Sequence, residues 1–170
     1  PMSKKTLQTI MASIIYVAIV WIIFMLLYIV FCYTTNGEFS FGFTKRELIA
    51  ILNSVVVLIV STAIAILVAH FSPKDELLSM IGNIVGLGSS FLCGIFVPQD
   101  MLGDNVLHAA KFLPFYWYVK ANNSIFSLAG ENFNEIEIYK YIAVEALFAV
   151  PLFILVFLLA KIKNSSSRTM

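Results

Sequence analysis

Four long apolar stretches dominate the chain, and short polar segments separate them. The stretches cover residues 10–33, 48–70, 77–97 and 141–160. Lys, Arg, Asp and Glu are absent from the first three, and the fourth contains one carboxylate, Glu145. At about 1.5 Å of rise per residue, a helix of about 20 residues crosses a hydrocarbon core of about 30 Å. The pattern therefore predicts an all-α integral membrane fold with four transmembrane helices.

Polar residues in front of three of these stretches have the pattern of helix caps. Before the third stretch, Ser72 is expected as the N-cap and Pro73 as the first helical residue. Thr44 precedes Glu47 by three residues, which is the spacing of a capping box. Asn134 stands three residues before Glu137 in the same way. Both pairs predict the start of a helix.

The longest connection joins the third and fourth stretches and is too apolar for a solvated loop. Residues 104–112 have the pattern of a short helix that Pro114 ends, and a second short helix is predicted over about 117–128. Four consecutive aromatic residues, 115–118, suit the headgroup level of a bilayer. We therefore expect residues 98–130 to form a re-entrant helical hairpin at one membrane face.

The composition also indicates a bilayer. Apolar residues make up 60% of the chain and charged residues 12%, against about 25% charged residues in an ordinary soluble domain. The 11 basic and 10 acidic side chains are too few to cover a soluble fold of this length. With a net charge of +1, the chain has no basic surface large enough to neutralise many phosphates of a nucleic acid, so a nucleic-acid partner is not expected.

Lys and Arg are denser on one side of the predicted topology. Residues 1–9, 71–76 and 161–170 hold six of them in 25 positions, whereas residues 34–47 and 98–140 hold five in 57. Short segments rich in Lys and Arg remain in the cytoplasm. Both termini are therefore predicted to be cytoplasmic and the hairpin extracellular.

The sequence lacks the motifs of common enzymes and cofactor sites. Lys5–Thr6 is the only Lys followed by Ser or Thr, and no glycine precedes it, so a Walker A loop is absent. His70 and His108 fall on opposite membrane faces in the predicted topology, which argues against a shared metal ion. We expect a protein that is not an enzyme and that has no metal, cofactor or ATPase site of its own.

Small residues recur at a spacing of four in the third stretch, at Gly82, Gly86, Ser90 and Gly94. Such residues let another helix approach closely. Two interpretations are open: packing against another span of the same chain, or a subunit interface beside a translocation path. Single amides within spans, Asn53 and Asn83, more often form hydrogen bonds between helices than ligand contacts. The candidates for the path or interface are Ser79, Gly82, Asn83, Gly86, Ser90, Gly94 and Glu145.

Glu145 is the only ionisable residue well inside a predicted span. An acid inside a membrane is by default a functional candidate. The alternative is an interfacial carboxylate, because Glu145 lies about four residues, or ~6 Å, below the predicted start of its helix. In that case it reaches water or pairs with Lys111, Lys120 or Lys140 on the same side.

Three segments resemble the permease subunit of bacterial ABC-2 type ABC transporters. The segments are Ser72–Leu77, Ser90–Pro98 (SFLCGIFVP) and Ala110–Tyr118 (AKFLPFYWY). In that family a small-residue helix ends in a "FLxGxFVP" run. An extracellular re-entrant hairpin with a "FLPxYW" element follows, and a last helix returns to the cytoplasm. Gly103–Asp104 departs from the pattern, since many members have a proline there.

The resemblance implies six spans in a complete permease, of which the four seen here would be the last four. Pro1–Lys5 is similar to the cytoplasmic "SPxSR/K" segment before the third span of the family. We therefore expect residues 1–170 to be a single transmembrane domain, the C-terminal part of a longer permease, with residues 161–170 as a cytoplasmic tail.

The resemblance also implies a function. It implies export or flipping of a hydrophobic or amphipathic substrate across a bacterial cell membrane. A separate ATPase subunit would power this transport. A second permease subunit would meet the small-residue helix near the dimer axis. The competing hypothesis is a non-transporting immunity or sensory subunit that only binds a partner. The segments expected to dock the ATPase contain Pro1, Ser3, Lys4, Lys5, Ser72, Lys74, Asp75 and Glu76.

Overall fold

The structure is a computed structural model, and it describes residues 4–36, 44–71, 74–126 and 133–166. Within these ranges every regular element is helical. The elements are α1 (Lys4–Asn36), α2 (Lys45–Phe71), α3 (Asp75–Leu92), the 3₁₀ turn η1 (Gln99–Met101), α4 (Asp104–Ala110), α5 (Pro114–Phe126) and α6 (Glu135–Ser166). The all-α prediction is confirmed for the described residues.

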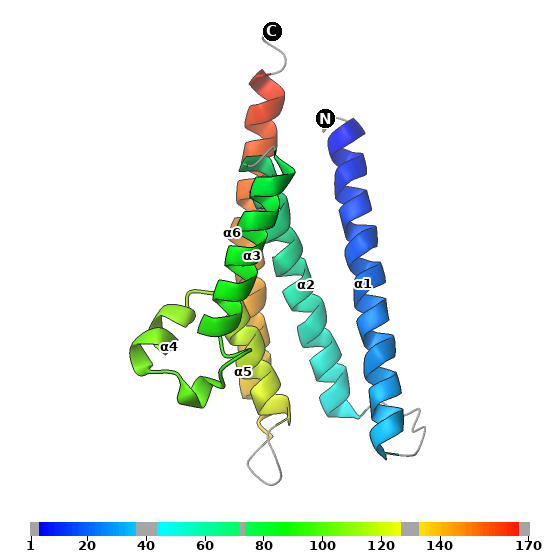
Figure 1. Ribbon diagram of the computed structural model, residues 1–170, viewed down its shortest axis with the longest axis vertical. Helices are drawn as coiled ribbons and strands as arrows, with labels where there is room; N and C mark the ends of the chain where they lie inside the picture. Colours follow the sequence, from blue (N-terminus) through cyan, green and yellow to red (C-terminus); the bar gives the residue numbers. More distant parts are fainter. Residues whose placement is uncertain (1–3, 37–43, 72–73, 127–132, 167–170) are drawn as a thin grey trace.

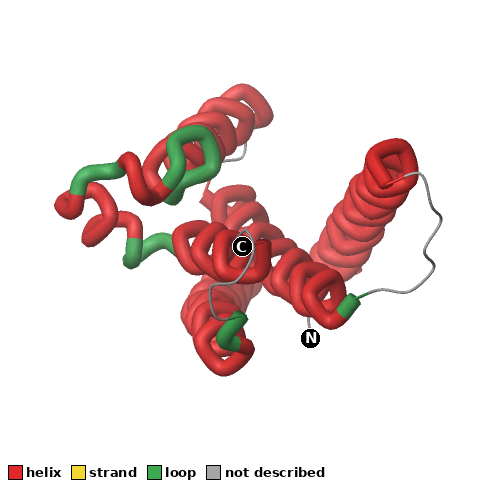
Figure 2. The backbone as a smooth tube through the Cα atoms, turned by 90° about the horizontal axis from the view of Figure 1, so that it is seen from below, coloured by secondary structure: helices red, strands yellow, loops and turns green. Residues whose placement is uncertain are grey.

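The long helices run up and down, so that α1 begins and α6 ends at the same end of the molecule (Figure 1). Helices α2, α5 and α6 pack closely against one another and form the centre. Helix α1 stands apart and touches only α2 to any extent (Figure 2). A hydrogen bond of 3.0 Å from Trp21 Nε1 to Ser54 Oγ joins that pair.

Two of the three predicted caps are present. The prediction for α3 is wrong, because Lys74 stands at its N-cap position, and Ser72 lies outside the described residues. The Thr44 N–H donates to Glu47 Oε2 at 2.7 Å, and the Glu47 N–H donates to Thr44 Oγ1 at 3.4 Å, which is a capping box at the start of α2. The Glu137 N–H donates to Asn134 Oδ1 at 3.4 Å at the start of α6. An ion pair joins the first residues of the two helices, because Lys45 Nζ lies 2.7 Å from Glu135 Oε1.

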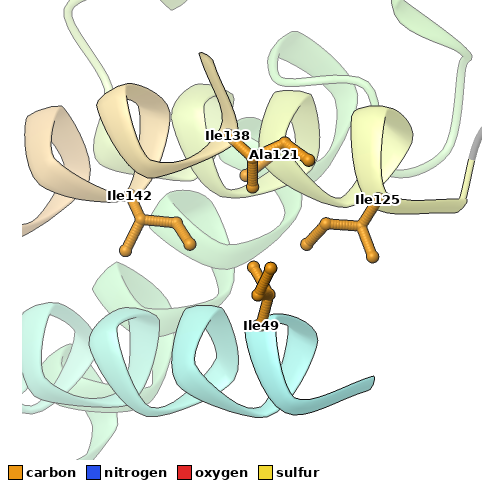
Figure 3. Close-up of a cluster of buried hydrophobic side chains, with 5 residues drawn as sticks. All are labelled: Ile49, Ala121, Ile125, Ile138 and Ile142. Carbon is orange, nitrogen blue, oxygen red and sulfur yellow. The ribbon is translucent and has the colours of Figure 1, made fainter. Parts of the chain in front are cut away.

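Isoleucines hold the three central helices together (Figure 3). Ile49 from α2 meets Ala121 and Ile125 from α5 and Ile138 and Ile142 from α6. We call these five side chains the isoleucine layer. Lipid tails are as apolar as isoleucine, so the gain in a bilayer comes from close packing.

Among the described residues, two helices are long and apolar enough to cross a membrane, α2 over Lys45–Ala69 and α6 over Glu135–Lys161. Helix α1 contributes a shorter apolar stretch, Ile14–Val30. Large apolar side chains cover the outer surfaces of these helices, for example Phe24, Leu147 and Phe157. An exposed apolar surface of this extent is typical of contact with lipid or with partner helices.

The prediction of a continuous third span over 77–97 is wrong at its end. Helix α3 stops at Leu92, with Cys93 at the C-cap position, and Gly94 has a φ of +98°. The N–H of Ile95 donates to the carbonyl of Ser90 at 3.0 Å. A left-handed glycine with this hydrogen bond is a Schellman motif, which ends a helix however apolar the following residues are.

Candidate functional site

The small-residue face of α3 is open. A Cβ added to Gly82 or Gly86 would meet nothing within 4 Å, and Ser79 and Asn83 are exposed as well. Ser90 is half-buried, and its hydroxyl donates within the helix to the carbonyl of Gly86 at 2.7 Å. Packing of this face against another span of the same chain, the first interpretation from the sequence, is therefore not found among the described residues.

Gly94 does not belong to that face, because it lies beyond the end of α3 in the turn that leads to η1. A Cβ on Gly94 would overlap Cγ of Gln99 and lie 3.3 Å from its backbone N. The side-chain amide of Gln99 donates to the carbonyls of Cys93 at 2.9 Å and of Tyr116 at 3.2 Å. We call this arrangement the Gln99 clasp, and it ties the end of α3 to the start of α5.

Sequence reasoning did not single out Gln99. Its one signal was a side-chain amide directly after Pro98, in a segment that is otherwise mostly apolar. An amide offers two N–H donors, which here reach the Cys93 carbonyl at the end of α3 and the Tyr116 carbonyl in the first turn of α5.

The two short helices of the hairpin are present as α4 and α5, but Pro114 is the first residue of α5 rather than only the end of α4. Proline is well suited to the first turn of a helix because its missing N–H would have no partner there. The indole N–H of Trp117 donates to the carbonyl of Lys111 at 2.9 Å and closes the turn between the two helices.

The aromatic run 115–118 does not form an exposed belt as expected. Tyr116 is only 4% exposed and packs with Cys93 and Ala110, and Phe115 and Trp117 are half-buried around them. The expectation of a headgroup anchor is therefore wrong for Tyr116, because Cys93 after the end of α3 and Ala110 of α4 cover its ring.

Asn53 joins α2 to α5, as expected for a single amide in a span. Its Nδ2 donates to the carbonyl of Tyr118 at 3.1 Å and to Asn122 Oδ1 at 3.0 Å. Asn53 is 0% exposed, and its Oδ1 has no hydrogen-bond partner.

Glu145 is also 0% exposed, and neither of its carboxyl oxygens has a hydrogen-bond partner. The interfacial interpretation is wrong, since a side chain that reaches water would be exposed. The pairing with Lys111, Lys120 or Lys140 is not found either. Lys120 Nζ instead lies over the ring of Tyr141, 4.9 Å from its centroid. Because α6 begins at Glu135, Glu145 lies in its third turn.

A sequence model of the family described as ABC-2 family transporter protein matches residues 1–160. The chain belongs to the ABC-2 transporter family. No curated protein and no solved structure gives a significant match. Family membership supports an ABC-2 type permease, a membrane component of transport, and the apolar helices agree with that assignment.

The segments of this ABC-2 chain that were expected to dock an ATPase are described only in part. Pro1, Ser3 and Ser72 lie outside the described residues. Lys4 and Lys5 begin α1, and Lys74, Asp75 and Glu76 are exposed at the start of α3. The starts of α1 and α3 lie at the same end of the molecule as the end of α6 (Figure 1).

Proposed function

We propose that the chain is the membrane-spanning permease subunit of an ABC-2 type exporter in a bacterial cell membrane. It moves a hydrophobic or amphipathic substrate with ATP that a separate ATPase subunit hydrolyses. The observation that carries the proposal beyond family membership is the open face of α3. A helix that presents glycines to its surroundings leaves a site for another helix, and in this proposal a second permease subunit fills it.

In this proposal α1, α2, α3 and α6 are four transmembrane helices. Helix α3 has only 18 residues, and the turn and hairpin that follow it complete its path across the membrane. The hairpin of η1, α4 and α5 lies on the outer side and enters the membrane along α5. The starts of α1 and α3 and the end of α6 face the cytoplasm, where Lys and Arg are dense.

The dimer contact is tested by crosslinking through cysteines placed on the open face of α3. Gly86→Leu adds a branched side chain there and is expected to reduce the crosslinked dimer several-fold. Ile84→Leu is the matched control, because Ile84 is an exposed α3 residue that already has a large side chain. Equal crosslinking in both variants would argue against a helix contact on this face.

The transport role is tested with inside-out membrane vesicles that contain the permease and a candidate ABC ATPase subunit, sought among the neighbouring genes. ATP should drive uptake of a fluorescent phospholipid or an amphipathic dye, and vesicles that lack either subunit should not show it. Co-purification of the two proteins without ATP-dependent movement of any such probe would favour the non-transporting subunit.

The orientation is tested by labelling. A cysteine at position 168 should react with a membrane-impermeant maleimide only after lysis, whereas a cysteine at exposed Phe112 should react in intact cells. The reverse result would invert the proposed topology.

A further inference from the structure

Three aromatic rings meet beside the ammonium of Lys120, where α5 packs against α6. Lys120 Nζ lies 4.9 Å from the ring centroid of Tyr141 on α6 and 5.8 Å from that of Tyr116 on α5. The ring of Trp117 contacts both tyrosines, with its centroid 5.2 Å from Tyr116 in an edge-on contact and 6.0 Å from Tyr141. We call the rings of Tyr116, Trp117 and Tyr141 the aromatic cage.

Contacts outside the aromatic cage hold each ring in place. The hydroxyl of Tyr141 donates to the carboxylate of Glu137, and the indole N–H of Trp117 donates to the carbonyl of Lys111. The ring of Tyr116 packs against Cys93 and Ala110. None of these contacts involves Lys120, so the rings can keep their arrangement when that lysine moves.

Lys120 is the movable part of the arrangement. It is half-buried, as are Trp117 and Tyr141, so the cage is open to its surroundings on one side. Its ammonium stands on a flexible four-carbon stem. Among the described residues the ion pair found is that of Lys45 with Glu135, and no carboxylate pairs with Lys120. Rotation of the stem would therefore empty the cage without breaking an ion pair of the described part of the chain.

The chemistry of the cage suits a methylated ammonium better than a lysine. A lysine ammonium has three N–H donors and is strongly hydrated, but a ring face accepts no ordinary hydrogen bond from it. A quaternary ammonium has no N–H and gives up less hydration on entering an aromatic site. Cages of this kind recognise choline and methyl-lysine.

Charge determines what must accompany that cation. A cation that entered the cage with Lys120 still beside it would be repelled by the lysine. A ligand with a phosphate next to its quaternary ammonium avoids the repulsion, because the displaced lysine can pair with the phosphate. A phosphocholine group has both charges at this spacing.

The position along α6 agrees with a headgroup ligand. Tyr141 follows the first residue of α6, Glu135, by six residues, which is about 9 Å along the helix axis. Glu137 and Lys140 are exposed in the same part of the helix. The cage therefore lies near the polar end of a helix whose following residues are apolar, which is the level of lipid headgroups.

We infer that the aromatic cage is a binding site for a phosphocholine group, with the quaternary ammonium among the rings and Lys120 moved onto the phosphate. Lys120 occupies the cage in the structure as a tethered substitute for the ligand. The group can come from a phosphatidylcholine headgroup or from a soluble phosphocholine ester. The inference goes beyond the proposed transport and does not depend on it, because contacts of α5 and α6 form the site.

Titration of Trp117 fluorescence tests the inference on the full chain in a maltoside detergent, which has no choline group. Trp21→Phe leaves Trp117 as the one tryptophan, and phosphocholine should change its emission in a saturable way. In this parent, Tyr141→Leu should weaken phosphocholine binding about tenfold, because one ring face is lost. Tyr139→Leu is the matched control, since Tyr139 is an exposed tyrosine of α6, and it should leave binding unchanged.

Lys120→Ala separates the two charges of the ligand. Choline, which has no phosphate, should bind this variant several-fold more tightly than the parent, because the tethered competitor is gone. The preference for phosphocholine over choline should fall several-fold, because the partner of the phosphate is gone. Weaker binding of choline to Lys120→Ala would overturn the inference, because the lysine would then support the rings rather than replace a ligand.

The same titration in nanodiscs distinguishes the two sources. If the lipid headgroup fills the site, soluble phosphocholine should bind in phosphatidylglycerol discs and not in phosphatidylcholine discs. Equal binding in both would assign the site to a soluble ester. A parent without a saturable signal, or equal binding by Tyr141→Leu and Tyr139→Leu, would refute the site. If Tyr141→Leu does not fold, the Lys120→Ala result decides alone.

Discussion

Replacing Gly94 by alanine tests whether the end of α3 depends on the Gln99 clasp. Gly94 has a φ of +98°, and a residue with a Cβ in the left-handed region costs about 1–2 kcal/mol. The new Cβ would also overlap Gln99 Cγ and displace a side chain that makes two hydrogen bonds. At about 0.5–1.5 kcal/mol for each hydrogen bond, the total loss of unfolding free energy is about 2–5 kcal/mol.

The assay is unfolding in mixed micelles, followed by the helical circular dichroism signal as the fraction of denaturing detergent rises. Gly88→Ala is the matched control, because Gly88 lies within α3 and an added Cβ meets nothing within 4 Å. Alanine there is expected to be neutral or to stabilise the helix by up to about 1 kcal/mol.

A double variant separates the two causes. In a Gln99→Ala background the overlap with Cγ of residue 99 is gone and only the approach to its backbone N at 3.3 Å remains, so Gly94→Ala should cost little more than the backbone strain of about 1–2 kcal/mol. Equal unfolding midpoints for Gly94→Ala and Gly88→Ala would show that the end of α3 does not depend on a glycine at position 94. If Gly94→Ala loses as much unfolding free energy in the Gln99→Ala background as in the wild type, the loss comes from backbone strain alone and the proposed overlap with Gln99 is refuted.

Three further outcomes follow from the contacts between helices. Glu145→Leu should leave the unfolding free energy unchanged or raise it by about 1–3 kcal/mol, because both carboxyl oxygens of Glu145 are buried without a hydrogen-bond partner and leucine removes them, whereas Glu145→Gln, which keeps buried polar atoms, should unfold near the wild type. Trp21→Phe should cost about 1 kcal/mol and reduce crosslinking between α1 and α2, and unchanged crosslinking would show that the indole hydrogen bond is not needed. Lys45→Ala should have little effect at high salt, because the pair with Glu135 is largely exposed, at 65% and 35% for the two side chains.

The sequence alone was sufficient for the class of fold and for several helix starts. Apolar runs of about 20 residues have few stable conformations other than a helix in lipid, and the described residues are helical. The pairs Thr44–Glu47 and Asn134–Glu137 marked the starts of α2 and α6 because capping acts over three residues of the same chain. The family was also recognisable from short runs such as SFLCGIFVP, which the family match over residues 1–160 confirms.

Only the tertiary structure decided where the third helix ends and what surrounds the polar residues. The apolar run continues past Leu92, but the left-handed conformation of Gly94 ends the helix, and Gln99 holds the turn from five residues away. The sequence placed Glu145 close to the membrane face, because its depth in the bilayer was counted from the start of the apolar run. Its burial depends on α2 and α5, which meet α6 from distant parts of the sequence. Hydropathy and capping are properties of neighbouring residues, whereas the partners of a buried side chain depend on how separate helices pack.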